Sequence, residues 1–262
     1  MRLTLAGASA IGGALFLWPF FGFGPAGDAP ALTVALATAL GFGAIELGAR
    51  RLDTRGLALL AALSALAAGL RLVLVTGIGG FSPFFFLILV AGYAIGPSFG
   101  FLTGALALVA SAIVTGGVGP WLPYQLFAAG WVGLGAGLVG RRAMRMPTRR
   151  DILILAAYGV VAGFAFGAVM DLWDWTFFRG APDLGWQAGL APLEAVSRYL
   201  RYYAVTSLAY DAFRAIGNAA MVIALGAPLL GAVARLRARW QLEVVPASSV
   251  SRSGDVAPAG SH

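Results

Sequence analysis

The chain contains no cysteine, and its single histidine, His262, is the last residue. Disulfide bonds, thiolate chemistry and histidine-ligated metals or haem therefore have no residues on which to form, and we expect neither a metal site nor a cofactor. Charged residues are also scarce, at 11% of the 262 residues, whereas 60% are hydrophobic. A water-soluble domain needs more charge on its surface, so the composition indicates a membrane protein.

Lysine is absent too, and the net charge of +7 comes from 18 arginines against 11 acidic residues. A single basic patch would suggest a nucleic-acid partner. Instead, most arginines lie beside hydrophobic runs, in three clusters at 50–55, 141–150 and 235–239. Such clusters are typical of the cytoplasmic ends of membrane-spanning helices, so no nucleic-acid partner is expected.

Long apolar runs are what the chain has in abundance. Crossing a hydrocarbon layer of roughly 30 Å takes about 20 apolar residues in a helix. The runs are continuous rather than alternating, which favours helices over the strands of a barrel. We expect an all-α bundle of eight membrane-spanning helices, near residues 3–22, 31–49, 56–76, 83–96, 98–115, 124–140, 151–177 and 205–234.

The arginine clusters predict the orientation of the chain. If they are cytoplasmic, the protein is a multi-pass protein of the inner (plasma) membrane with both termini in the cytoplasm. The joints at 23–30, 77–82, 116–123 and 178–204 then lie outside. Residues 1–22 could instead be a cleaved signal, because Arg2 precedes an apolar run.

Three regions follow from this pattern. We expect residues 1–49 to supply two N-terminal transmembrane helices and residues 50–240 to form a six-helix membrane core. The remainder, 241–262, is rich in Ser, Gly, Pro and Ala near its end and is expected to be a disordered cytoplasmic tail.

Small residues recur at the spacing of a helix face. Such stripes let helices pack closely in lipid, where the hydrophobic drive between helices is weak. Glycine stripes occur at Gly96, Gly100 and Gly104, at Gly133 and Gly137, and at Gly159, Gly163 and Gly167. An alanine-rich face containing Ala61 and Ala65 is either another internal seam or a docking face for a partner subunit, and the spacing fits both.

Polar side chains gather in the half of the bundle that is predicted to be outer. A charge near the bilayer centre costs about 2.5–3.5 kcal/mol even on a lenient scale, so these groups must face protein or water. Asp171 and Asp174 lie one helical turn apart, near Trp175. We interpret the two carboxylates as part of a binding site.

A second polar group lies on the last span. Tyr210, Arg214 and Asn218 recur every four residues and so share one face of a helix. Arg214 is the natural counter-ion for Asp171 or Asp211, and a purely structural buried pair is the alternative to a binding site.

The joint around 116–125 combines flexible glycine with rigid proline and carries Trp121, Tyr124 and Gln125. Such loops shape ligand sites, although Trp and Tyr also anchor helices at the membrane surface. Phe84 carries the same ambiguity. The predicted substrate-binding residues are Phe84, Trp121, Tyr124, Gln125, Asp171, Asp174, Trp175, Tyr210, Arg214 and Asn218.

Several stretches match a known family. The chain resembles the substrate-binding S component of energy-coupling factor (ECF) vitamin transporters over about residues 55–235. The matching stretches are residues 61–71, Gly92-Tyr93-Ala94-Ile95-Gly96-Pro97 with Gly100 and Gly104, Gly119-Pro120-Trp121-Leu122-Pro123-Tyr124-Gln125, and Gly217-Asn218-Ala219.

The resemblance implies a subunit that binds a vitamin from outside and works in the lipid bilayer with a transmembrane scaffold subunit and two ATPase subunits. In that family the first core helix docks on the scaffold through an alanine-x-x-x-alanine face, which Ala61 and Ala65 match. No Walker sequence occurs, so ATP hydrolysis would belong to the partners. The branch that the chain resembles most includes cobalamin-specific members, which makes cobalamin the first expected substrate.

Two other functions stay open on the sequence. A membrane enzyme such as a prenyltransferase would use Asp171 and Asp174 to hold magnesium for a diphosphate substrate. Such enzymes bring several carboxylates and basic residues to one pocket, whereas this chain offers one aspartate pair with Arg214. The other alternative is a structural membrane subunit without a ligand. We expect no enzyme activity.

Overall fold

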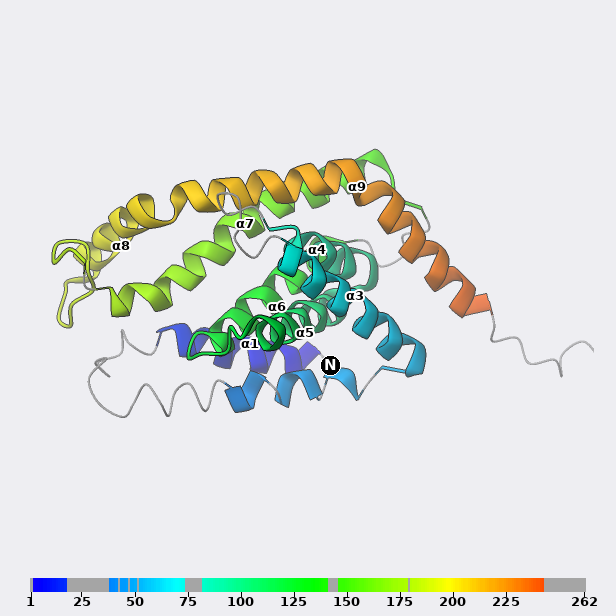
Figure 1. Ribbon diagram of the computed structural model, residues 1–262, viewed down its shortest axis with the longest axis horizontal. Helices are drawn as coiled ribbons and strands as arrows, with labels where there is room; N and C mark the ends of the chain where they lie inside the picture. The colour runs from blue at the N-terminus through cyan, green and yellow to red at the C-terminus, as the bar shows by residue number, and fades with distance from the viewer. Residues whose placement is uncertain are drawn as a thin grey trace, which may run out of the picture.

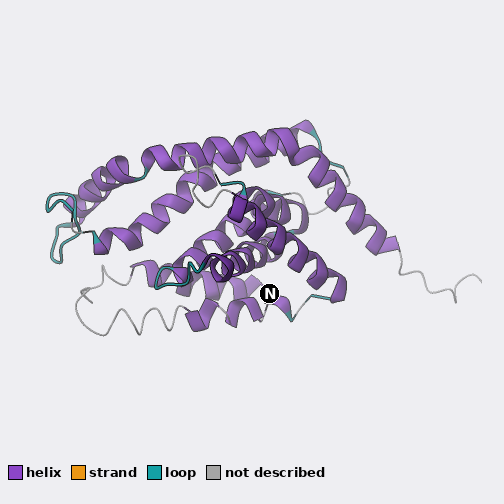
Figure 2. Cartoon of the chain, viewed as in Figure 1, coloured by secondary structure: helices purple, strands orange, loops and turns teal. Residues whose placement is uncertain are grey.

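The computed structural model describes residues 2–17, 38–41, 43–46, 48–50, 52–73, 82–140, 146–178 and 180–242. The secondary structure of these residues is helical, without strands (Figure 2). Its named helices are α1 (Arg2–Leu17), α3 (Thr54–Val73), α4 (Phe84–Ile95), α5 (Pro97–Thr115), α6 (Leu122–Val139), α7 (Arg149–Phe177), α8 (Pro192–Thr206) and α9 (Leu208–Leu242). The all-α prediction is confirmed.

Most predicted spans have a helical counterpart. Five helices are long and apolar enough to cross a membrane, namely Thr54–Leu72, Pro97–Thr115, Leu122–Val139, Arg149–Phe177 and Leu208–Arg239. The short fourth span corresponds to α4, an apolar helix of 12 residues. The predicted joint at 23–30 lies outside the described residues. So does the predicted tail of 241–262, except for its first two residues, which belong to the helix that ends at Leu242.

Helix α8 was not predicted. Residues 178–204 were expected to be a joint because their apolar positions are interleaved with charged ones, yet 15 residues of this segment and its border form a helix. Pro192 stands in its first turn, where a missing N–H costs nothing. Leu193, Val196 and Leu200 are exposed on one side, while Tyr202 is buried on the other. The spacing of these apolar residues was a signal for an amphipathic helix.

Glycines bring α4, α5 and α6 into close contact. A Cβ atom added to Gly100 of α5 would lie only 2.6 Å from the Cα atom of Gly92 in α4. One turn further along α5, a Cβ atom at Gly104 would lie 2.6 Å from the carbonyl carbon of Ala129 in α6. The predicted packing role of Gly100 and Gly104 is therefore confirmed. Gly96 instead separates α4 from α5 with a φ of 136°, and an added Cβ atom there would have nothing within 4 Å.

Helices α7 and α9 are the longest described helices, with 29 and 35 residues, and they run side by side in opposite directions (Figure 1). The third glycine stripe faces α9, because a Cβ atom on Gly163 would lie 2.7 Å from the Cα atom of Ala215. The start of α7 is fixed by a capping box between Thr148 and Asp151. The hydroxyl group of Tyr93 in α4 donates a second bond to Asp151, at 2.8 Å.

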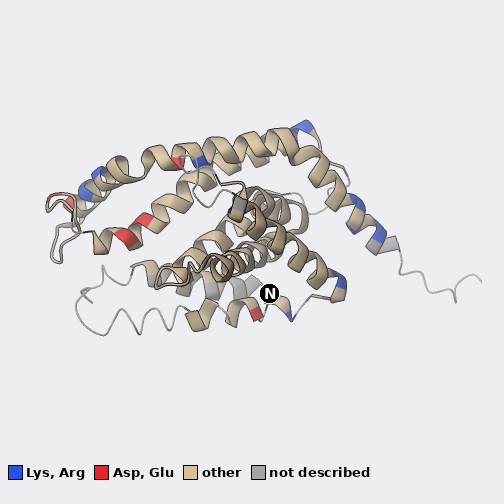
Figure 3. Cartoon of the chain, viewed as in Figure 1, with Lys and Arg blue, Asp and Glu red and all other residues tan. Residues whose placement is uncertain are grey.

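The bundle has a basic end. One end of the long axis holds the starts of α3 and α7 and the last turns of α9. Figure 3 shows arginine in blue at each of these places. Helix α8 and the acidic end of α7 lie toward the other end. With the basic end in the cytoplasm, as predicted, α8 marks the outer end.

The N-terminal residues pack on one side of the core. A Cβ atom at Gly12 of α1 would lie 2.6 Å from the Phe127 ring of α6. Within 38–49, a Cβ atom at Gly48 would lie 2.8 Å from the side chain of Leu102 in α5. Ala61 and Ala65 of α3 are exposed, so the described N-terminal residues leave this face uncovered.

Candidate functional site

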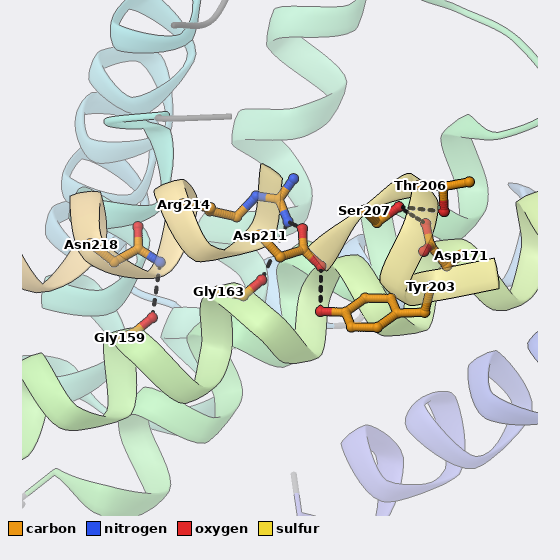
Figure 4. Close-up of polar contacts among 9 residues, drawn as sticks. All are labelled: Gly159, Gly163, Asp171, Tyr203, Thr206, Ser207, Asp211, Arg214 and Asn218. Carbon is orange, nitrogen blue, oxygen red and sulfur yellow. Dashed lines mark hydrogen bonds and ion pairs between the residues drawn. The ribbon is translucent and has the colours of Figure 1, made fainter. Parts of the chain in front are cut away.

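Polar residues of α9 face the glycine stripe of α7 (Figure 4). The side-chain amide of Asn218 donates a hydrogen bond to the carbonyl oxygen of Gly159 at 3.0 Å. One turn toward α8, Arg214 donates to the carbonyl oxygen of Gly163 at 3.3 Å. Because glycine carries no side chain, its carbonyl oxygen is open to a donor from the neighbouring helix.

Arg214 forms its ion pair with Asp211, three residues earlier on α9. The sequence left Asp171 and Asp211 as alternatives, and the structure selects Asp211, whose side chain is only 1% exposed. The Tyr203 hydroxyl of α8 donates to the second carboxylate oxygen at 3.0 Å. Burial, together with the hydrogen bond to Asp211, raises the pKa of Tyr203, so its hydroxyl stays protonated and remains a donor at neutral pH.

Aromatic rings surround the guanidinium group of Arg214. Its central carbon lies 5.1 Å from the ring centroid of Phe166, 5.4 Å from that of Tyr210 and 6.0 Å from that of Phe85. Faces of aromatic rings attract cations, most strongly where water is excluded. We call these three rings the Arg214 cage. It joins α4, α7 and α9 around one charge.

Asp171 belongs to α7, and its side chain faces the residue before the start of α9. Its Oδ1 atom accepts a hydrogen bond from the Ser207 hydroxyl at 2.9 Å. Its Oδ2 atom is buried and has no partner among the described residues. Asp174, one turn further along α7, is exposed. The two carboxylates therefore have different surroundings.

The joint before α6 contributes a separate group. Trp121 is 40% exposed, and its indole N–H donates to the carbonyl oxygen of Gly117 at 3.2 Å. Tyr124 is buried, and its ring centroid lies 5.6 Å from that of Trp173 in α7. Gln125 is half-buried in the first turn of α6.

The family model of the ECF transporter, substrate-specific component, matches residues 56–226. The chain belongs to this family. Its members are the specificity subunits of ECF transporters, which bind small-molecule substrates in the plasma membrane and work with scaffold and ATPase subunits. They are not enzymes. No curated protein and no solved structure matches the chain.

Membership confirms the predicted S component at the level of the family. The match runs from the first turn of α3 into α9 and leaves α1 outside it. It also removes the prenyltransferase alternative.

Within this S component, Trp175 has a structural role. It is 1% exposed, and its indole N–H donates to the carbonyl oxygen of Leu184 at 2.6 Å. Its ring also packs on Tyr199 of α8, with centroids 5.4 Å apart. Trp175 therefore anchors the segment between α7 and α8.

The predicted residues of the S component fall into three groups. Phe84, Tyr210, Arg214 and Asn218 lie where α4 and α9 meet, and the ring of Phe84 packs edge-on against Phe85 of the Arg214 cage at 5.1 Å. Asp171 and Trp175 belong to the contact of α7 with α8 and the start of α9. Trp121, Tyr124 and Gln125 form the third group at the start of α6. Asp174 is exposed and lies outside all three groups.

A cavity of about 90 Å³ lies between α6 and α7. Ligand pockets usually measure about 300–1,000 Å³, so this cavity cannot hold a vitamin by itself. It is lined by Ala128, Trp131, Val132, Tyr158, Ala162, Ala165, Phe166 and Val169.

Sequence reasoning missed Ser207, Tyr203 and Arg71. Tyr203 lies in the segment that was expected to be a joint, and Ser207 lies near the start of the last predicted span, so their approach to Asp211 and Asp171 could not be seen from the sequence. Arg71 ends an apolar run, and a charged residue at the predicted outer end of a span was a signal for it.

Proposed function

We propose that this S component captures a vitamin at its outer end, with cobalamin as the first candidate. The proposal depends on two buried acceptor atoms that have no partner among the described residues, Oδ2 of Asp171 and Oδ1 of Asn218. Leaving a buried polar atom unpaired costs about 1–3 kcal/mol. A ligand that donates hydrogen bonds to both atoms would recover this free energy. Ligand binding therefore explains why the two acceptor atoms are left unpaired in the protein alone.

The spacing of the two atoms favours a bulky solute. Asn218 is bonded to Gly159, and 12 residues separate Gly159 from Asp171 along α7, which corresponds to about 18 Å. A small vitamin would reach only one of the two positions. Cobalamin is large enough to approach both, and this supports it as the first candidate.

The other predicted residues supply complementary surfaces. Phe84, Trp121, Tyr124 and Tyr210 offer ring faces, Gln125 offers an amide, and Arg214 offers a cation whose charge is balanced by Asp211. In this proposal the exposed Asp174 lines the entrance to the site. In this proposal Trp175 acts by holding the segment that borders the site, through its bond to Leu184.

Titration of the purified protein tests this function. The S component in detergent is titrated by calorimetry with cobalamin and with a panel of other vitamins. We expect saturable binding of cobalamin with a Kd in the micromolar range or below, about −8 kcal/mol or stronger. Binding of another vitamin alone would retain the capture function and replace the substrate. Absence of binding across the panel would contradict the proposal.

We also propose how the subunit is arranged in its transporter. Ala61 and Ala65 form the docking face for the scaffold subunit, because both are exposed on α3. The basic end of the bundle and both termini lie in the cytoplasm, and residues 1–49 form an additional helix pair beside the 50–240 core. The family membership and the exposed alanine face support the docking part of this proposal, and the arginine clusters support the orientation.

A further inference from the structure

A second arginine, Arg71, lies at the proposed outer end of the bundle. It belongs to the last turn of α3, 16 residues or about 24 Å along the helix from Arg55 in the first turn. Its guanidinium group donates to the hydroxyl of Ser111 in α5 at 2.8 Å. The central carbon of the group lies 5.6 Å from the ring centroid of Phe84 in α4. Ser111 and Phe84 are both buried, so the guanidinium group points into the bundle.

Arg71 and Arg214 differ in how their charges are balanced. Arg214 is paired with Asp211. Among the residues that the structure describes, Arg71 forms no ion pair. A guanidinium group has five N–H donors, and the hydroxyl of Ser111 takes one of them. The remaining donors and the positive charge are available to a ligand.

The start of α4 adds to the positive potential near Arg71. Phe84 is the first residue of α4, and the preceding Pro83 provides no side-chain cap. The free N–H groups in the first turn of a helix carry a partial positive charge. A full cation and a helix N-terminus therefore meet beside the ring of Phe84.

The surroundings of Arg71 adjoin the Arg214 cage. The link between them is the ring of Phe84, whose centroid lies 5.6 Å from the guanidinium carbon of Arg71. The ring of Phe84 also contacts Phe85 of the cage, with centroids 5.1 Å apart. A ligand beside the Arg214 cage is thus also within reach of Arg71.

We propose that Arg71 binds an anionic group of the transported solute, either a carboxylate or a phosphate. The inference rests on the capture function proposed above and adds the chemical class of the ligand. The planar fork of a guanidinium group matches two oxygens of such an anion, and Ser111 and Phe84 hold the fork in place. Cobalamin fits this class, because a phosphodiester links its nucleotide to the rest of the molecule.

Matched ligands and matched variants test the inference. Cobalamin is compared with cobinamide, which lacks the phosphodiester-linked nucleotide, and biotin is compared with its neutral amide. We expect the purified protein to bind the anionic member of one pair at least tenfold more tightly. Arg71→Gln removes this preference, whereas Arg71→Lys retains part of it. Arg201→Gln is the control, because Arg201 is an exposed arginine of α8 at the same end.

Each outcome decides the inference. Binding of both members of each pair with equal affinity overturns it while the capture function stands, and so does an unchanged preference in Arg71→Gln. Absence of binding for every probe overturns both proposals. If Arg71 instead holds a lipid phosphate, Arg71→Gln releases bound phosphatidylglycerol in native mass spectrometry and leaves the ligand preference unchanged, which also overturns the inference. Thermal unfolding of Arg71→Lys provides a folded reference.

Discussion

The side-chain amide of Asn218 donates to the carbonyl oxygen of Gly159 across the α7–α9 contact, at 3.0 Å. This bond connects two features that look independent in the sequence, a glycine stripe on one helix and a polar face on another. The amide nitrogen serves the packing of the helices, while the amide oxygen has no partner among the described residues. One residue thus fixes the helix pair and keeps an unpaired acceptor, which is the atom that we propose to bind the ligand.

The glycine stripe of α7 should be intolerant of even one added carbon. Gly163→Ala places a Cβ atom 2.7 Å from the Cα atom of Ala215, so the helices must move apart. We expect a loss of about 1–3 kcal/mol in the free energy of unfolding, measured by denaturant titration in detergent micelles. Gly69→Ala in α3 is the control, because nothing lies within 4 Å of its added Cβ atom. Equal effects of the two variants would contradict the close packing.

The Asp211–Arg214 pair should be coupled. Arg214→Leu leaves the buried carboxylate of Asp211 without its cation and is expected to cost about 3–5 kcal/mol in unfolding free energy. Adding Asp211→Asn to that variant removes the unpaired charge and should recover part of the loss. A double-mutant cycle measures the coupling. Strictly additive effects would show that the two side chains do not form a pair.

Docking on the scaffold subunit should weaken when a large side chain replaces an alanine of the proposed docking face on α3. Ala61→Trp places a large ring on the proposed docking face, so we expect less scaffold and ATPase to co-purify with the subunit, while vitamin binding is retained. Ala157→Trp adds the same ring to an exposed position on α7 and should leave assembly intact. Assembly that is equally efficient in both variants would exclude this face.

The absence of cysteine makes the orientation easy to test. Arg201→Cys in α8 should react with a membrane-impermeant maleimide added to intact cells. Arg239→Cys, at the basic end of α9, should react only after the cells are permeabilised. The wild-type chain supplies the background, since it has no thiol. The reverse labelling pattern would invert the proposed topology.

Much of the fold follows from the sequence because membrane spans are governed by length and apolar composition. The spans around α5, α6 and α7 were predicted to within a few residues, and the glycine stripes identified packing faces before their partners were known. Helix α8 was not predicted because it is amphipathic, and continuous apolar runs do not reveal such a helix.

The sequence predicted which types of residue form the candidate site, but it did not predict which of them pair with each other. Periodicity placed Arg214 and Asn218 on one face, but it could not choose between Asp171 and Asp211 as the counter-ion, because the choice depends on the register of two helices. That register is set by Gly163 and Gly159, which lie about 50 residues or more away in the chain. The roles of Ser207 and Arg71 depend on the same three-dimensional contacts.

The central claim is that the unpaired acceptors bind the solute, and a comparison of binding constants tests it most directly. Wild type, Asp171→Asn and Asn218→Leu are titrated with the vitamin that the wild type binds, and their thermal unfolding is recorded beside it. Asp171→Asn keeps the shape of the side chain and removes its charge. We predict at least tenfold weaker binding in both variants, or about 1.4 kcal/mol, with Asp171→Asn still folded. Wild-type affinity in both folded variants would contradict the account.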